Sequence, residues 1–310
     1  MFFCGDVARN VSTEKQNPMS SFRSKAPELN DAARRQTDGS YIQLPNGVTH
    51  YELGNPTRNQ TVVLVHGFSV PYYIYDPTFH FLAQHGFRVL RYDLFGRGYS
   101  DRPEADYDID FFVKQLEDLL DGLLLRQPVS LAGLSMGGPI TATFTSRHPD
   151  RVDKLILIDP VGAHPIPLSW LLRVGSLPFV GEALVALFGR DSMVRNIASD
   201  FSEKKLDKYF LDRYIDQMQY KGFRRALLST IRSHMLNSFM DVYRKVGLLN
   251  KPVLLIWGRQ DTTVPLSHSD ELLAAMPQTE FHIIEDTSHI PHYEKPDETN
   301  PLLLEFLRKS

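Results

Sequence analysis

Short, continuous apolar runs alternate with segments of helical periodicity along most of the chain. A run that is apolar at every position is typical of a parallel strand covered by helices on both faces. Residues 61–65 form such a run up to His66, and further strands are predicted at residues 87–93, 129–134, 155–159, 253–257 and 280–284. Apolar residues spaced by three and four predict helices at residues 77–85, 109–125, 138–147, 267–275 and 301–308. The alternation predicts an α/β fold with a mostly parallel, doubly wound sheet.

Two segments depart from this alternation. Residues 41–44 and 49–53 alternate around the turn Pro45-Asn46-Gly47, which predicts a hairpin before the first parallel strand. Residues 164–246 contain no buried-strand pattern and are interrupted by several glycines and prolines. A long insertion without a sheet of its own predicts a helical cap or lid. It follows the strand at 155–159, so it would roof the strand ends where open parallel sheets bind ligands.

These patterns divide the chain into three parts. Residues 39–163 and 247–310 form the predicted core, and residues 164–246 form the predicted cap. Residues 1–38 are polar and without apolar periodicity, so we expect a flexible N-terminal arm.

Composition and charge exclude several classes of protein. The 34 basic and 37 acidic side chains leave a net charge of −3, which argues against a nucleic-acid-binding protein. The one cysteine, Cys4, excludes an intramolecular disulfide framework and a cysteine-based zinc site. We recognise neither a secretory signal pattern nor a run of about 20 apolar residues, so the default expectation is a cytoplasmic protein. The composition specifies no oligomeric state.

The strongest chemical signal is a Gly-x-Ser-x-Gly pattern centred on Ser135. It follows the apolar run at 129–134 and precedes the helical segment at 138–147. A serine hydroxyl needs exposure, positioning and a base before it can act as a nucleophile. A sharp strand-to-helix turn flanked by small residues exposes it, and the helix N-terminus favours developing negative charge. The alternative is a phosphate-binding turn or a plain glycine-rich loop.

Further motifs give the chain a family resemblance. His66-Gly67-Phe68 follows the strand at 61–65, and Asp93 opens a segment that continues through Gly96 and Gly98 to Ser100. Gly258 leads to Asp261, and Thr287-Ser288 leads to His289. Together with the Ser135 turn, these residues resemble the α/β-hydrolase superfamily of Ser-His-Asp serine hydrolases, from residue 40 to the C-terminus. The family's order along the chain is nucleophile, acid and histidine, and this sequence follows it.

The resemblance implies roles for a base and an acid. His289 stands where the family places its base, and His292 is the rival three residues later. Asp261, at the end of the strand at 253–257, stands where the acid is expected. Asp159 also ends a strand and is a competitor, because some relatives place the acid there. Ser135, Asp261 and His289 are therefore the predicted catalytic residues.

The resemblance also implies an oxyanion hole. Acyl transfer creates an oxyanion that two backbone N–H groups usually hold, and here these would belong to Met136 and Phe68. The loop continues to Tyr72 and Tyr73, which either line the substrate pocket or pack beneath the loop.

Two neighbouring residues have structural interpretations. His66 belongs to the oxyanion loop, where its counterpart in the family is usually structural. Asp93 is expected to anchor the loop that it opens.

The residue types narrow the range of reactions that the resemblance implies. Serine at position 135 excludes the dehalogenases and epoxide hydrolases that use aspartate there. The loop at 66–71 only partly matches that of hydrolases that cleave carbon–carbon bonds in ring-fission products. The resemblance therefore implies a carboxylesterase or a small-glyceride lipase. Carbon–carbon cleavage is the alternative, and a non-catalytic ligand receptor on the same fold is a third interpretation.

The expected partner is a small apolar ester, and no metal or organic cofactor is implied. Residues 168–174, which include Trp170, and residues 177–180 are strongly apolar. They fit a lipophilic pocket roof, with internal packing as the alternative and contact with a membrane surface as a lesser one.

Overall fold

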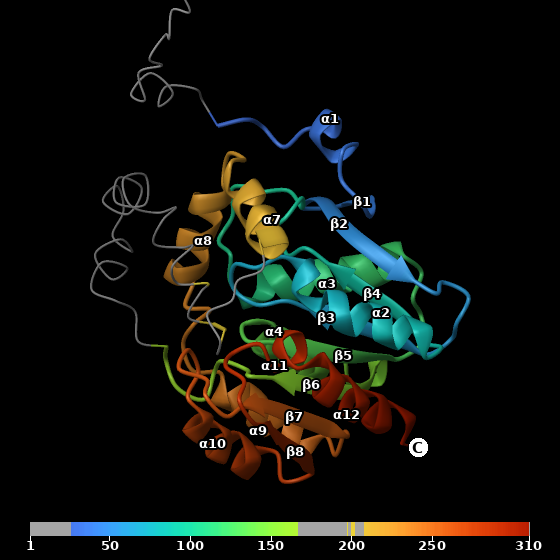
Figure 1. The fold of residues 1–310 in the computed structure, drawn as a ribbon, viewed down its shortest axis with the longest axis vertical. Coiled ribbons are helices and arrows are strands. Elements are labelled where there is room, and N and C mark those ends of the chain that lie inside the picture. Colours follow the sequence, from blue (N-terminus) through green and yellow to red (C-terminus); the bar gives the residue numbers. More distant parts are fainter. Residues whose placement is uncertain (1–25, 167–196, 198–199, 202–207, 310) are drawn as a thin grey trace, which may run out of the picture.

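The computed structural model describes residues 26–166, 197, 200–201 and 208–309, which form a layered α/β structure (Figure 1). Eight strands make one sheet in the order β1-β2-β4-β3-β5-β6-β7-β8. Pairing is parallel from β4 through β8, which confirms the predicted mostly parallel sheet. The strands are β1 (Ser40–Leu44), β2 (Gly47–Gly54), β3 (Thr61–Val65), β4 (Arg88–Tyr92), β5 (Val129–Leu134), β6 (Val152–Ile158), β7 (Val253–Gly258) and β8 (Thr279–Ile284).

The predicted hairpin forms one edge of this sheet. β1 and β2 pair antiparallel from Ser40↔Tyr51 to Leu44↔Gly47, and β2 also pairs antiparallel with β4. Gly47 has a φ of +142°, a backbone conformation that favours glycine at this turn. The turn chemistry therefore sets the register of the edge hairpin.

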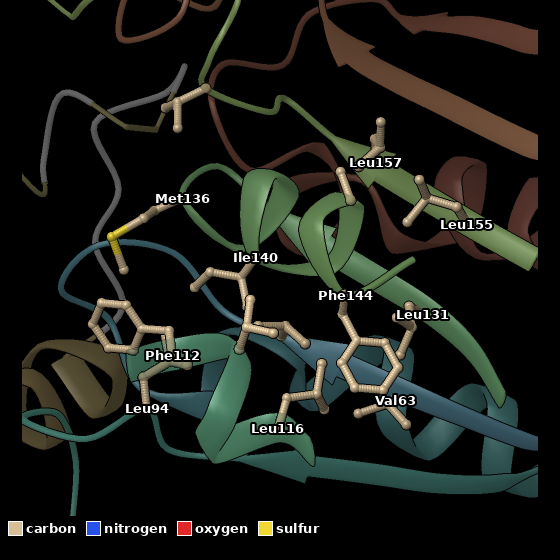
Figure 2. Packing of buried hydrophobic residues seen from close by; sticks show 14 of the residues in the cluster. Val63, Leu94, Phe112, Leu116, Leu131, Met136, Ile140, Phe144, Leu155 and Leu157 are labelled. Atoms are coloured by element: carbon tan, nitrogen blue, oxygen red, sulfur yellow. The ribbon is translucent and has the colours of Figure 1, made fainter. Parts of the chain in front are cut away.

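Helices cover both faces of the sheet, which explains the continuous apolar runs. Val63 and Val65 of β3 face one apolar cluster, whereas Val62 and Leu64 face the other. The first cluster includes residues of α3, α4, α9 and α10, and Figure 2 shows Ile140 and Phe144 of α4 packed there. The second includes residues of α2 and α12. These helices are α2 (Asp76–Gln84), α3 (Ile109–Gly122), α4 (Gly137–Arg147), α9 (Met240–Leu248), α10 (Ser269–Ala275), α11 (Pro291–Glu294) and α12 (Pro296–Arg308).

The start of α12 and the boundary between cap and core differ most from the sequence prediction. α12 begins at Pro296, earlier than the predicted 301, because proline fits the first turn of a helix; Pro301 lies inside it. α9 spans the predicted boundary between cap and core at 246, and it packs against α4 and α10. α9 therefore belongs with the helices that cover the sheet.

The described part of the predicted cap is helical. α7 (Lys208–Met218) and α8 (Phe223–Arg232) lie beside each other at one end of the sheet (Figure 1). No helix within the described ranges is long and apolar enough to cross a membrane. The apolar segments at 168–174 and 177–180, including Trp170, lie outside the described residues, and so does Cys4.

Part of the predicted arm contacts the rest of the chain. Residues 26–38 include the short helix α1 (Asp31–Arg34), and Arg34 is buried against Asp101. Lys221, between α7 and α8, donates from its backbone to Pro27 O at 3.0 Å and pairs with Glu28 at 2.7 Å. This segment therefore joins the loop after β4 to the helices of the insertion.

Candidate active site

Ser135 lies on the turn between β5 and α4. Its φ is +52°, a left-handed conformation that is uncommon for a residue other than glycine. A Cβ built at Gly133 would lie 2.3 Å from Gly137 O, and one built at Gly137 would lie 2.2 Å from Val65 O. Only glycine permits this close approach, so the two glycines of the pattern let the chain turn sharply and hold Ser135 at the strand end.

Asp261 and His289 are brought together from the ends of two neighbouring strands. Asp261 follows β7 and His289 follows β8, and His289 Nδ1 lies 2.7 Å from Asp261 Oδ2. The backbone N–H groups of Thr263 and Val264 both donate to Asp261 Oδ1 at 2.8 Å. These donors orient the carboxylate toward the imidazole. Both side chains are buried, so the pair interacts in a low-dielectric setting.

The negative charge of Asp261 and the positive charge of protonated His289 stabilise each other. Burial alone would lower the pKa of His289, but the Asp261 carboxylate and further acidic groups raise that pKa to about 9. Burial alone would raise the pKa of Asp261, but His289 lowers it below its usual value. Asp200 lies next to His289, since its backbone oxygen accepts a hydrogen bond from His289 N at 3.2 Å, and its carboxylate also raises the pKa of His289. An imidazole in this setting has a high affinity for a proton.

The rival residues have other contacts. Asp159 is fully buried at the end of β6, and its Oδ1 accepts a hydrogen bond from Gly258 N at 2.9 Å. His292 is fully buried, its ring centroid lies 4.7 Å from that of Tyr75, and burial lowers its pKa to about 3.

Three of these side chains could in principle ligate a metal ion. Ligand atoms of Asp159, Asp261 and His289 lie within 4.8 Å of one another. The contact between His289 Nδ1 and Asp261 Oδ2 already accounts for the proximity of two of these side chains, so the cluster by itself does not indicate a metal site.

The predicted oxyanion loop passes against the nucleophile turn. A Cβ built at Gly67 would lie 3.1 Å from the Cβ of Ser135. Met136 is fully buried at the N-cap position of α4, and Phe68 follows Gly67. Backbone N–H groups at a helix N-terminus and on such a loop can stabilise an oxyanion.

Residues that sequence patterns did not single out hold this loop. Phe68 O accepts a hydrogen bond from Arg97 Nε at 2.8 Å. Gln217 of α7 donates to Ser69 O at 3.0 Å, and the Tyr214 hydroxyl, also on α7, donates to Ser69 Oγ at 3.0 Å. The helices of the insertion therefore contact the oxyanion loop directly, across separations in sequence that no local pattern could reveal.

Arg97 is a buried cation whose observed hydrogen bonds are to uncharged oxygen atoms. It is 0% exposed, and it also donates to Phe95 O at 3.1 Å and to Thr230 Oγ1 of α8 at 2.8 Å. Burial lowers the pKa of its guanidinium to about 9. The one sequence signal was its place between Gly96 and Gly98, which suggested only a loop.

His66 and Asp93 have structural contacts. His66 Nε2 accepts a hydrogen bond from Leu94 N at 2.9 Å, and burial lowers the pKa of this imidazole to about 4. Asp93 accepts hydrogen bonds from Tyr72 N and Tyr99 N, both at 2.9 Å, and lies 2.7 Å from His50 Nδ1. Asp93 therefore anchors the loop that it opens.

Tyr72 and Tyr73, which follow the oxyanion loop in the chain, are buried. The Tyr72 ring stacks on His50 with centroids 4.8 Å apart, and the Tyr73 hydroxyl donates to Phe210 O at 3.3 Å. Both border a polar cavity of about 200 Å³ whose lining includes Arg213 but none of Ser135, Asp261 and His289. Their observed contacts are those of packing residues.

Comparisons with known proteins agree with this geometry. A family model described as the alpha/beta hydrolase fold matches residues 60–296. The chain belongs to the α/β-hydrolase family. It is 26% identical over 280 residues to the AB hydrolase superfamily protein YisY of Bacillus subtilis, covering 86% of this chain and 98% of that protein.

One further relative and one solved structure resemble the chain over most of its length. A 2-hydroxy-6-oxononadienedioate/2-hydroxy-6-oxononatrienedioate hydrolase of Burkholderia vietnamiensis is 28% identical over 282 residues, covering 88% of this chain and 93% of that protein. The crystal structure of the enol-lactonase from Burkholderia xenovorans superposes with a TM-score of 0.74 at 21% identity, covering 87% of this chain and 100% of the other. The protein is thus an α/β hydrolase.

Proposed function

We propose that this α/β hydrolase cleaves carboxylic esters through a Ser135–His289–Asp261 triad, as a carboxylesterase or small-glyceride lipase. The observation that supports it most is the 2.7 Å contact between His289 Nδ1 and Asp261 Oδ2, which leaves Nε2 of the imidazole for a substrate-facing role. Ser135 on its strained turn supplies the nucleophile.

The mechanism has two steps. His289 removes the proton from the Ser135 hydroxyl, and the oxygen attacks the ester carbonyl carbon. The N–H groups of Met136 and Phe68 stabilise the oxyanion. His289 then protonates the leaving alcohol, which yields an acyl-enzyme. A water molecule deprotonated by His289 attacks this intermediate, the acid leaves, and Ser135 regains its proton.

Asp261 holds the imidazole in the tautomer that carries a proton on Nδ1. It also stabilises the imidazolium formed at each proton transfer, as the acidic surroundings of His289 favour. We infer that the insertion at 164–246 acts as a cap over these strand ends, and that a small apolar ester is the substrate. The contacts of α7 with Ser69 support the first inference.

The second candidate is carbon–carbon-bond hydrolysis. It is favoured by the 28% identity to the Burkholderia vietnamiensis hydrolase over 88% of this chain. The same three residues, Ser135, His289 and Asp261, would catalyse cleavage of a vinylogous diketo acid.

The test is a rate series with p-nitrophenyl esters from acetyl to palmitoyl, beside a vinylogous diketo acid. We expect ester turnover that Ser135→Ala abolishes, with Asp261→Asn slower by about 10⁴-fold, since the wrong tautomer is then held. Turnover of the diketo acid alone would favour the second candidate. Folded protein without turnover of either substrate would contradict both.

A control variant tests whether Asp261 or Asp159 is the acid of the triad. Asp159→Asn should act far more like the wild type than Asp261→Asn does. The opposite order would move the triad acid to the end of β6.

A further inference from the structure

A second carboxyl group is buried beside the Asp261–His289 pair. Asp159 is 0% exposed and directly follows β6, with a φ of +41°. Its Oδ1 accepts a hydrogen bond from Gly258 N at 2.9 Å, whereas its Oδ2 is buried and receives no hydrogen bond from the described residues. A buried polar atom without a hydrogen-bond partner destabilises the fold, so a physical explanation is needed for the unpaired Oδ2.

The Asp261 carboxyl group lies beside that of Asp159. Oxygen atoms of Asp159 and Asp261 and a ring nitrogen of His289 lie within 4.8 Å of one another. Asp261 accepts three hydrogen bonds, from Thr263 N, Val264 N and His289 Nδ1, which together stabilise its ionised form. Two ionised carboxylates this close would repel each other strongly away from water, so one of the two must hold a proton.

The surroundings distinguish the two carboxyl groups. Burial, and then the charge of Asp261, raise the pKa of Asp159 well above its usual value. The pKa of Asp261 is lowered despite burial, because His289 faces it. Glu294 of α11 disfavours a negative charge at Asp159. Asp200, in the segment before α7, and His268, just before α10, interact electrostatically with Asp261.

We propose that Asp159 is protonated in the resting enzyme and donates a hydrogen bond from Oδ2 to the Asp261 carboxylate. This makes Asp159 a positioning residue, and the inference rests on the proposed roles of Asp261 and His289. The donated hydrogen bond reduces the proton affinity of Asp261. It therefore limits how tightly Asp261 holds the charged imidazolium, which must lose its proton before His289 can act as a base.

The test measures the pH dependence of Ser135 labelling by a fluorophosphonate reagent, which needs no natural substrate. Asp159→Ala removes the donor, so Asp261 becomes more basic and holds the imidazolium more strongly. The acid limb of the labelling rate should move up by about one pH unit, which slows labelling about tenfold below that limb. Asp159→Asn, whose amide can both donate and accept, should restore the wild-type profile.

Two outcomes would overturn the proposal. An acid limb that does not move in Asp159→Ala would mean that the residue is only structural. A loss in Asp159→Asn as large as in Asp261→Asn would mean that Asp159 must be ionised. Thermal unfolding of each variant, followed by circular dichroism, checks that the labelled protein is folded.

A direct measurement is independent of catalysis. The infrared carbonyl band of a neutral carboxylic acid should be present in the wild type at neutral pH and absent in Asp159→Asn. A band unchanged by this substitution would overturn the proposal, even if Ser135 is labelled normally. If Ser135 is not labelled in the wild type, the proposed function fails, and the infrared band still decides the state of Asp159.

Discussion

Replacement of Gly258 by alanine should separate His289 from Asp261. Gly258 is the last residue of β7, and a Cβ built there would lie 1.8 Å from Ser288 O, in the loop that carries His289. Real Cβ contacts are rarely under 3.0 Å, so the two segments must move apart by about 1.2 Å. β7 is buried between β6 and β8, so the loop is the part that gives way.

The structure sets the size of the effect. A shift of this size would lengthen the 2.7 Å contact between His289 Nδ1 and Asp261 Oδ2 beyond hydrogen-bonding range. Misplacement of a catalytic group by about 1 Å can slow a reaction about 100-fold. Overpacking should lower the free energy of unfolding by about 1–3 kcal/mol, which the protein can tolerate.

The assay is the labelling rate of Ser135 by a fluorophosphonate, measured on protein shown to be folded by circular dichroism. Gly54→Ala is the matched control, because Gly54 also ends a strand and its nearest neighbour is a side-chain atom, Phe79 Cζ, at 3.0 Å. Labelling of Gly258→Ala within about threefold of the wild type would refute the reasoning.

Four further predictions concern groups around the site. Arg97→Met removes the donor to Phe68 O, so it should slow labelling of Ser135 about 10- to 100-fold. An unchanged labelling rate would show that Arg97 does not hold the oxyanion loop in place. The labelling rate should rise with pH to a plateau above about 9, because His289 must be neutral to act as a base; a plateau reached already at pH 7 would contradict this. The same raised pKa means that charged His289 stabilises the fold fully below about pH 6.5 and loses this contribution as pH rises through about 9. Conversely, neutral buried His292, with a pKa near 3, stabilises the fold above pH 6.5 and progressively less toward pH 3, so urea unfolding of His292→Leu should depend less on pH in this range.

Local patterns in the sequence determined the sheet and the nucleophile turn. The continuous apolar runs predicted the strands, because each buried strand of a parallel sheet meets helices on both faces. The glycines around Ser135 predicted the turn, because their lack of a side chain is what lets the backbone segments approach. Periodicity and turn chemistry are carried by neighbouring residues, so they can be recognised without the fold. The sequence predicted the ends of helices less accurately. In α12, Pro301 fits the first turn of a helix, where the prediction placed it, but it lies inside the helix.

Only the tertiary structure decided which side chains meet. Asp159 and Asp261 both end apolar strands, and only the family resemblance favoured Asp261 as the acid. The fold brings Asp261 Oδ2 to 2.7 Å from His289 Nδ1 and directs Asp159 Oδ1 toward Gly258 N. Arg97 likewise reaches Thr230 across 133 positions of sequence. Such contacts depend on how whole strands and helices pack, and the charge and protonation of each group follow from the burial and neighbours that packing creates.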